Sequence, residues 1–206
     1  MAQNVIVYDL EIQEDPAVVG WENTFELKMS SCVAYSYATK QYHFFGHTDE
    51  ERIRCLEFLN GATCVTFNGI KFDSKVLLGN DRRVSPLGET CNISKSVTEP
   101  VYSWKNFDIY MKILLKLTKN TDCTNVMDNK AYHGKGLYSL DTMCTKTLGI
   151  SKNGDGALAP KLFKDGKFYE LLQYNLQDVR MTKQLFEFIQ EHKYALNGAN
   201  EWIEFA

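Results

Sequence analysis

The sequence VIVYDLEI, residues 5–12, places two carboxylates directly after an apolar run. The run from Val5 to Tyr8 carries no charge, which is typical of a buried strand. Successive side chains of a strand point to opposite faces of its sheet, so Asp9 and Glu11 are expected to point the same way. The stretch therefore predicts a core strand that ends with a pair of carboxylates on one face.

Another carboxylate follows a turn signal. Residues 64–67 form a short apolar run that is typical of a strand, and Asn68-Gly69 comes directly after it. Asp73 precedes an apolar stretch, and we expect a helix from about Ser74 to Leu78 with Asp73 near its N-terminus. This segment thus predicts a strand, a turn and a helix in succession.

The last carboxylate lies in a long helical pattern, which runs from Phe168 to about His192. Tyr174 and Asp178 are four residues apart in this pattern, so the two side chains are expected to share a face of the helix. The three segments together supply four carboxylates: Asp9, Glu11, Asp73 and Asp178.

Four carboxylates in one place point to a particular chemistry. Their negative charges repel one another strongly unless divalent cations bind between them. Carboxylate oxygens are hard ligands, which favour Mg²⁺ or Mn²⁺. Two such ions about 3.5–4 Å apart stabilise both the attacking and the leaving oxygen of an in-line displacement at phosphorus. If the segments converge, they predict a two-metal nuclease site.

The three segments resemble, in the same order, the three motifs of the DEDD superfamily of 3′-5′ exonucleases: Asp9-Leu10-Glu11, residues 68–73 (NGIKFD) and Tyr174-x-x-x-Asp178. Residue 173 is Gln, where the histidine subtype of this superfamily would have His, so the chain fits the tyrosine subtype, DEDDy. The resemblance spans roughly residues 5–188. It is closest in pattern to the proofreading exonuclease domains of B-family DNA polymerases and to stand-alone ribonuclease H-like exonucleases.

The resemblance implies a fold and an activity. The fold would be α/β and ribonuclease H-like, a mixed five-stranded sheet flanked by helices, in a single exonuclease domain over residues 1–206. The activity would be metal-dependent 3′-5′ hydrolysis of single-stranded nucleic acid or nucleic-acid 3′ ends, with DNA favoured. Two Mg²⁺ or Mn²⁺ ions would be the cofactors, and nucleoside 5′-monophosphates the products.

Roles for individual residues follow from the same resemblance. Asp9 would bridge the two ions, and Tyr174 would orient the attacking water. Asn68 and Gly69 would lie beside the bound strand, although a plain turn explains them equally well. Phe72 could stack on a terminal base, which is worth roughly 1–3 kcal/mol, but a core position is the more common role of such a Phe.

Two other classes of function remain open. One is a catalytically inactive nucleic-acid-binding module on the same fold, which would have little reason to keep four carboxylates and the tyrosine. The other is a ribonuclease H-like endonuclease or resolvase, which would share the acidic residues without needing the Tyr-x-x-x-Asp arrangement.

The remaining pattern predicts a mixed sheet with helices. Extended runs are expected at residues 4–10, 28–38, 41–46, 63–67 and 104–108, with a hairpin at Thr39-Lys40. A capping-box pattern opens a helix at Thr48 that reaches about Leu59. Further helices are expected at residues 74–78, 109–117, 139–149 and 168–192. We expect Asp108 to cap the helix after it or to support the site, and residues 201–205 to form an edge strand or a tail.

Composition is compatible with this reading. A chain of 206 residues with 44% apolar residues is typical of one globular domain. The net charge of −3 is neutral evidence, because an exonuclease that holds a few terminal nucleotides needs no large basic surface. Basic residues in two long loops could still contact phosphates: Arg82, Arg83, Lys119, Lys130 and Lys135.

No signal-like segment and no run of 18 apolar residues is present, so we expect an intracellular, cytoplasmic protein that does not contact membranes. The six cysteines lack zinc-ligand spacing and are expected to be buried, reduced thiols. His43 and His47 are not expected to bind a metal, because their spacing does not place them together on a strand.

Overall fold

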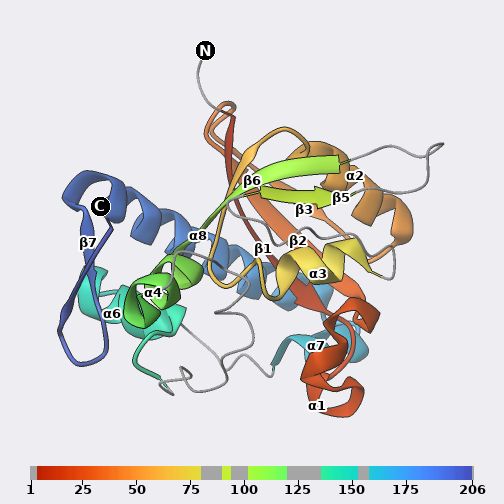
Figure 1. Cartoon of the computed structure of the whole chain (residues 1–206). Coiled ribbons are helices and arrows are strands. Elements are labelled where there is room, and N and C mark those ends of the chain that lie inside the picture. Colours follow the sequence, from red (N-terminus) through yellow and green to blue (C-terminus); the bar gives the residue numbers. More distant parts are fainter. Residues whose placement is uncertain (1–3, 80–89, 94–101, 120–135, 153–157, 206) are drawn as a thin grey trace.

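A mixed β-sheet forms the centre of the computed structural model, which describes residues 4–79, 90–93, 102–119, 136–152 and 158–205 (Figure 1). Its strand order is β3-β2-β1-β4-β6-β5. The strands are β1 (Val5–Ile12), β2 (Met29–Ser36), β3 (Gln41–Phe45), β4 (Thr63–Thr66), β5 (Thr90–Ile93) and β6 (Tyr102–Asp108). β1 pairs antiparallel with β2 and parallel with β4, and β4 pairs parallel with β6.

The sheet contains all five strands expected from the sequence. β2 and β3 form the predicted antiparallel hairpin, and Lys40 in its turn has a φ of 57°. A sixth strand, β5, pairs antiparallel with β6 at the sheet edge. It spans four residues in a segment that we expected to be a loop, because a strand this short gives no measurable alternation of apolar residues. The predicted fold class, α/β with a mixed sheet flanked by helices, is confirmed.

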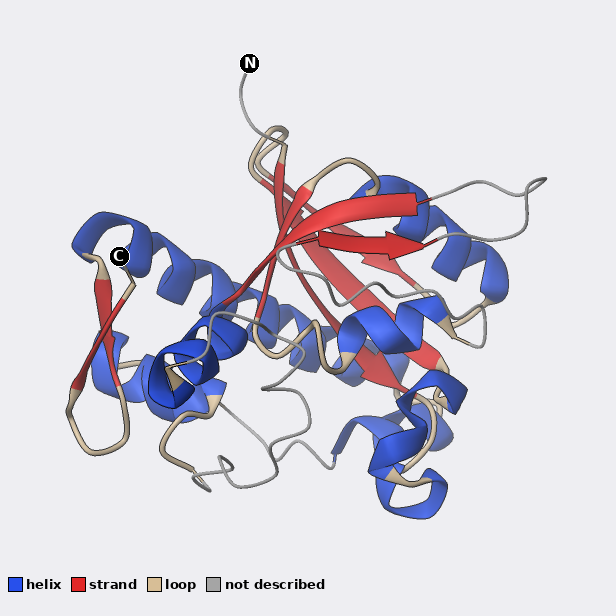
Figure 2. Ribbon diagram, viewed as in Figure 1, coloured by secondary structure: helices blue, strands red, loops and turns tan. Residues whose placement is uncertain are grey.

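Helices cover both faces of the sheet (Figure 2). α2 (Asp49–Leu59) begins as predicted, with the hydroxyl of Thr48 accepting a hydrogen bond from the Glu51 N–H at 3.3 Å. α3 (Asp73–Leu78) follows β4, and α8 (Phe168–His192) spans the whole of the predicted long helix. The sequence predicted these helices because helix caps and the spacing of apolar residues depend only on residues a few positions apart.

The two faces of β1 pack against different helices. Tyr8 and Leu10 belong to the apolar core that includes residues of α2 and α3. Val7, on the opposite face, packs with Val179 of α8. Since side chains alternate along a strand, Asp9 and Glu11 share the face of Val7 and therefore lie under α8.

A second apolar core lies at the C-terminal end of α8. It is built with α4 (Ile109–Thr118), α6 (Leu140–Leu148) and a separate two-stranded sheet of β7 (Tyr194–Leu196) and β8 (Trp202–Glu204). The segment 201–205 thus contains a strand, but this strand pairs with β7 instead of extending the main sheet.

Three short helical segments had no counterpart in the predicted elements: α1 (Pro16–Val19), η1 (Trp21–Glu26) and α7 (Leu158–Lys164). The segment between the helices predicted at residues 109–117 and 139–149 lies almost entirely outside the described residues. Among the helices that are described, none combines the length and the apolar character needed to cross a membrane.

Candidate metal centre

Carboxylates from β1 and α8 meet at one point of the structure. One carboxylate oxygen from each of Asp9, Glu11 and Asp178 lies within 4.8 Å of the other two. We call these three residues the acidic cluster. Asp178 is 5% exposed and Asp9 is partly buried, so the cluster is largely shielded from water. Strand β1 and helix α8 therefore contribute to one group of ligand atoms, although Asp9 and Asp178 are 169 residues apart in sequence.

Asp73, the fourth predicted carboxylate, lies beside the cluster. It is the first residue of α3 and is 4% exposed. One of its oxygens, Oδ1, accepts a hydrogen bond from the backbone N–H of Leu10 at 3.0 Å, between the two carboxylate-bearing residues of β1. This bond fixes the start of α3 against β1.

The carboxylates raise one another's pKa. Burial is the largest cause for Asp9, and the charges of Asp73, Asp178 and Glu11 raise the pKa of Asp9 further. Burial raises the pKa of Asp73 to about 7, although two backbone N–H groups oppose that rise. So many carboxylates in one buried place are unfavourable for the folded chain by itself, which is the pattern expected of a functional site.

Lys152 is the counter-charge that the sequence analysis missed. Its ammonium lies 2.5 Å from Oδ2 of Asp178 and 4.4 Å from the ring centroid of Tyr174. Its backbone N–H donates to Oδ1 of Asp141 in α6, which anchors the segment. Lys152 lies in an irregular segment 22 residues before Tyr174, so no local pattern in the sequence links it to the site.

Tyr174 faces the cluster from α8, one helical turn before Asp178. Its side chain is 5% exposed and packs with Leu162 and Leu171. Burial raises its pKa to about 12, and the ammonium of Lys152 opposes the rise. The phenol therefore stays protonated at neutral pH.

Asn175 is a second residue that sequence reasoning missed. It is fully buried in α8, and its Nδ2 donates to Oδ2 of Asp9 at 2.8 Å. Its spacing of three residues from Asp178 would have placed both side chains on one face of the helix. Asn175 holds the carboxylate of Asp9 in place from the helix side.

The Asn68-Gly69 turn is held by Asp108. The carboxylate of Asp108 accepts the N–H groups of Asn68 and Ile70, both at 2.9 Å, and caps α4 through the N–H of Met111 at 3.1 Å. The predicted capping role of Asp108 is thus confirmed. Asn68 itself has a φ of 69°, and its Oδ1 is buried and has no hydrogen-bond partner among the described residues.

Gly69 and Phe72 have packing roles. A Cβ on Gly69 would lie 2.6 Å from the Cβ of Thr66, so no larger residue fits there without movement. Phe72 is partly buried and packs against the main core.

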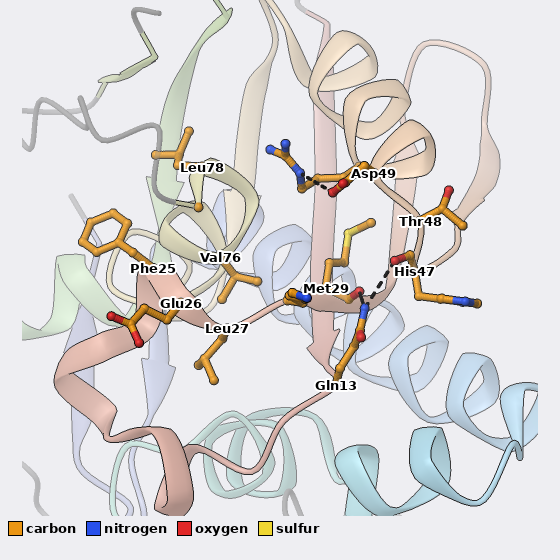
Figure 3. Close-up of a pocket in the computed structure, with 13 residues that line it drawn as sticks. Gln13, Phe25, Glu26, Leu27, Met29, His47, Thr48, Asp49, Val76 and Leu78 are labelled. Atoms are coloured by element: carbon orange, nitrogen blue, oxygen red, sulfur yellow. Dashed lines mark hydrogen bonds and ion pairs between the residues drawn. The ribbon is translucent and has the colours of Figure 1, made fainter.

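A pocket of about 220 Å³ lies between η1, α2 and α3 (Figure 3). Its lining includes Gln13, Phe25, His47, Arg52 and Val76 but no residue of the acidic cluster. Gln13 crosses one side of it, donating through Nε2 to the carbonyls of Met29 and His47 at 2.8 and 3.3 Å. This pocket is therefore separate from the carboxylates.

The other candidate residues are only partly described. Lys119 is the left-handed C-cap of α4, whereas Arg82, Arg83, Lys130 and Lys135 lie outside the described residues. Cys32, Cys55, Cys64 and Cys144 are buried free thiols, as expected. Within the described part of the chain, neither His43 nor His47 belongs to a group of side chains that could hold a metal.

Comparison with known proteins identifies the fold. No model of a protein family matches the chain, and no curated protein matches it. The chain is similar to the structure of the family B DNA polymerase from the hyperthermophilic archaeon Pyrobaculum calidifontis, with a TM-score of 0.58 and 16% sequence identity. The similarity covers 92% of this chain and 25% of the polymerase chain, so this chain corresponds to about a quarter of that protein. The chain has the ribonuclease H-like fold that its sequence predicted.

Proposed function

We propose that residues 1–206 form a metal-dependent 3′-5′ exonuclease domain of the DEDDy type. The observation that carries the proposal is the acidic cluster, in which Asp9, Glu11 and Asp178 bring oxygen atoms within 4.8 Å of one another. Asp73 lies next to them, and its charge raises the pKa of Asp9. These are the four carboxylates of the three motifs, in a fold shared with part of a family B DNA polymerase.

The donor set fits divalent cations with oxygen ligands. Oδ1 of the buried Asp178 has no hydrogen-bond partner among the described residues, so a buried acceptor is left for a ligand. Asp9, Glu11, Asp73 and Asp178 would hold two Mg²⁺ or Mn²⁺ ions. When bound, such ions neutralise the carboxylates and stabilise charge on the attacking and leaving oxygens of a phosphodiester.

The other residues of the site would position the reacting groups. Tyr174, protonated at neutral pH, would donate a hydrogen bond to the attacking water and orient it. Lys152 would hold Asp178 and the Tyr174 ring in their places, as its contacts with both indicate. Asn175 would fix the orientation of Asp9. Products would be nucleoside 5′-monophosphates.

The substrate we propose is the 3′ end of single-stranded nucleic acid, with DNA favoured. The similarity to a DNA polymerase supports this choice. Asn68 is kept as a substrate-contacting residue because its turn leads directly into Asp73, with the N–H of Phe72 donating to the Asn68 carbonyl at 3.1 Å and Gly69 and Phe72 shaping the turn.

The test is degradation of 3′- and 5′-labelled single-stranded DNA and RNA with Mg²⁺ or Mn²⁺. We expect stepwise shortening from the 3′ end that EDTA and Asp9→Ala abolish and that Tyr174→Phe slows. Internal fragments, or cutting of a circular substrate, would point to an endonuclease instead. Binding without cleavage of any substrate would identify an inactive binding module.

A further inference from the structure

A group of exposed aromatic side chains surrounds the turn between α7 and α8. Residues 164–170 are all exposed, and this run includes Phe168 at 45% and Tyr169 at 73% exposure. We call the following residues the α7–α8 platform: His47, Phe163, Phe168 and Tyr169. Aromatic side chains this exposed lack the stabilisation that most aromatic residues gain from burial in a core. A group of them on the surface often marks a binding site.

Three of these rings are arranged as one surface. The His47 imidazole is stacked on the Phe168 ring, with centroids 5.5 Å apart and an interplanar angle of 6°. Phe163 meets both rings edge-on, at 5.3 Å from His47 and 5.7 Å from Phe168. In Figure 3 the His47 side chain points away from the pocket that its backbone lines. The rings come from α7, from α8 and from the connection between β3 and α2.

The α8 residues of the platform lie on the same helix as Tyr174 and Asp178, nearer to its N-terminus. Phe163 packs against the group of buried residues that contains Leu171 and Tyr174. Phe168 precedes Asp178 by ten residues in α8, which is about 15 Å along a helix axis. An extended strand of a few nucleotides is long enough to cover this distance along the helix axis.

Basic residues alternate with these aromatics. Lys161, Lys164 and Lys167 are exposed. Asp165 and Glu170 lie in the same segment, so the local charge is only weakly positive. Aromatic rings interleaved with lysines are the arrangement that single-stranded nucleic acids use, since bases stack on rings while phosphates contact ammonium groups.

Another exposed aromatic pair provides a contrast. Trp202 of β8 is 68% exposed and stacked on Tyr194 at 4.2 Å, but Glu201 and Glu204 are its sequence neighbours. Glu204 is paired with Lys116 at 3.3 Å, which leaves this surface close to neutral instead of positive, so it would attract a phosphate backbone less than the platform. Charge therefore distinguishes the platform from this second aromatic surface.

We propose that the α7–α8 platform binds the single-stranded part of the substrate upstream of the scissile bond. Bases stack on Phe168 and Tyr169, while the three lysines contact the backbone. The inference rests on the proposed exonuclease function and adds to it a second binding region, outside the acidic cluster and the Asn68 turn. With this second region, the affinity of the protein for a single-stranded oligonucleotide should increase with the length of the oligonucleotide.

The test measures binding and cleavage separately. Binding of a fluorescent oligodeoxynucleotide about eight nucleotides long is followed by anisotropy in EDTA, where cleavage cannot occur, and hydrolysis of a dinucleotide is followed with Mg²⁺. We expect Phe168→Ala and Tyr169→Ala each to weaken binding of the longer oligonucleotide by about tenfold, the effect of losing one stacked base. Dinucleotide hydrolysis should stay unchanged. Trp202→Ala is the matched control and should alter neither quantity.

A further variant tests the charge. Replacing Lys161, Lys164 and Lys167 by Gln should lower the dependence of log K on log salt by about 0.7 for each lost phosphate contact. Tyr169 is so exposed that its replacement should not disturb folding, which circular dichroism verifies. The inference is overturned if both aromatic variants bind like the wild type, or if they lose dinucleotide hydrolysis equally. An uncleaved substrate that still binds through the platform would refute the exonuclease proposal alone.

Discussion

The buried aspartates Asp108 and Asp178 lie in two regions of opposite character. Asp108, at the end of β6, accepts three backbone N–H groups, and these bonds oppose the rise that burial causes in its pKa. The carboxylate of Asp178, in the acidic cluster, has Lys152 as its one hydrogen-bond partner among the described residues and faces other carboxylates. A buried carboxylate whose oxygens all accept hydrogen bonds stabilises the fold. A buried carboxylate that has an oxygen without a partner and lies beside like charges is expected where a ligand binds. Two aspartates that are both at most 5% exposed thus have two different roles.

The largest effect should follow from changing the acidic cluster. Asp9→Asn keeps an acceptor for Asn175 and removes one charge. We expect activity to fall on the order of 10³-fold or more, the scale seen when a group that stabilises charge in a transition state is lost. The free energy of unfolding without metal should stay equal or rise by about 1 kcal/mol, because repulsion between carboxylates is relieved. Nuclease assays and urea denaturation measure the two quantities, and a clear loss of stability would contradict a functional role for this charge.

The same substitution at Asp108 should act the other way. Asp108→Asn leaves one backbone N–H of the turn facing an amide N–H₂ group. A buried donor without a partner costs about 1–3 kcal/mol, and a lost bond to a charged group costs a further 1.5–3 kcal/mol. We expect a fall of about 3–5 kcal/mol in unfolding free energy with residual nuclease activity in the folded fraction. An unchanged denaturation midpoint would show that the turn does not depend on this carboxylate.

The pH dependence of stability sharpens the contrast further. Asp73 holds its proton up to about pH 7 in the folded chain, whereas its ordinary pKa is 3.8. Stability is therefore fully present below pH 3.8 and falls as pH rises through about 7, by up to about 1.4 kcal/mol per pH unit for this one proton. Urea denaturation in EDTA should show this slope, and Asp73→Asn should reduce it. Mg²⁺ should restore stability most strongly at the upper end of the range. Stability that rises over this interval would contradict the assignment.

Sequence predicted the parts of the site that depend on local pattern. Asp9 and Glu11 follow from alternation in one strand, Asp73 from the start of α3, and the pair Tyr174 and Asp178 from helical spacing. Their order along the chain carried the resemblance to a known family. The sequence could not show how close the carboxylates come to one another, because that depends on the pairing of β1 with its neighbours and on the packing of α8.

The missed residues share a physical reason. Lys152 reaches Asp178 and Tyr174 from an irregular segment whose path is fixed by its bond to Asp141. His47 and Phe168 stack although 121 residues separate them. Contacts of this kind are set by tertiary packing and leave no periodicity. The longer strands and helices and the motif residues were therefore predictable, while the short elements, the counter-charge and the aromatic platform needed the structure.

The smallest effect should come from the turn that joins the two regions. Gly69 lies between Asn68 and Ile70, whose N–H groups Asp108 holds, and a Cβ there would approach the Thr66 side chain at 2.6 Å. Gly69→Ala should lower the unfolding free energy by about 1–3 kcal/mol, the usual cost of overpacking. Thr66→Ala removes two of the three close atoms, so the double variant should lose less than the sum of the single variants, with a coupling of about 0.5–3 kcal/mol. Strict additivity in urea denaturation would mean that Gly69 serves the bound strand and not the packing beneath the turn.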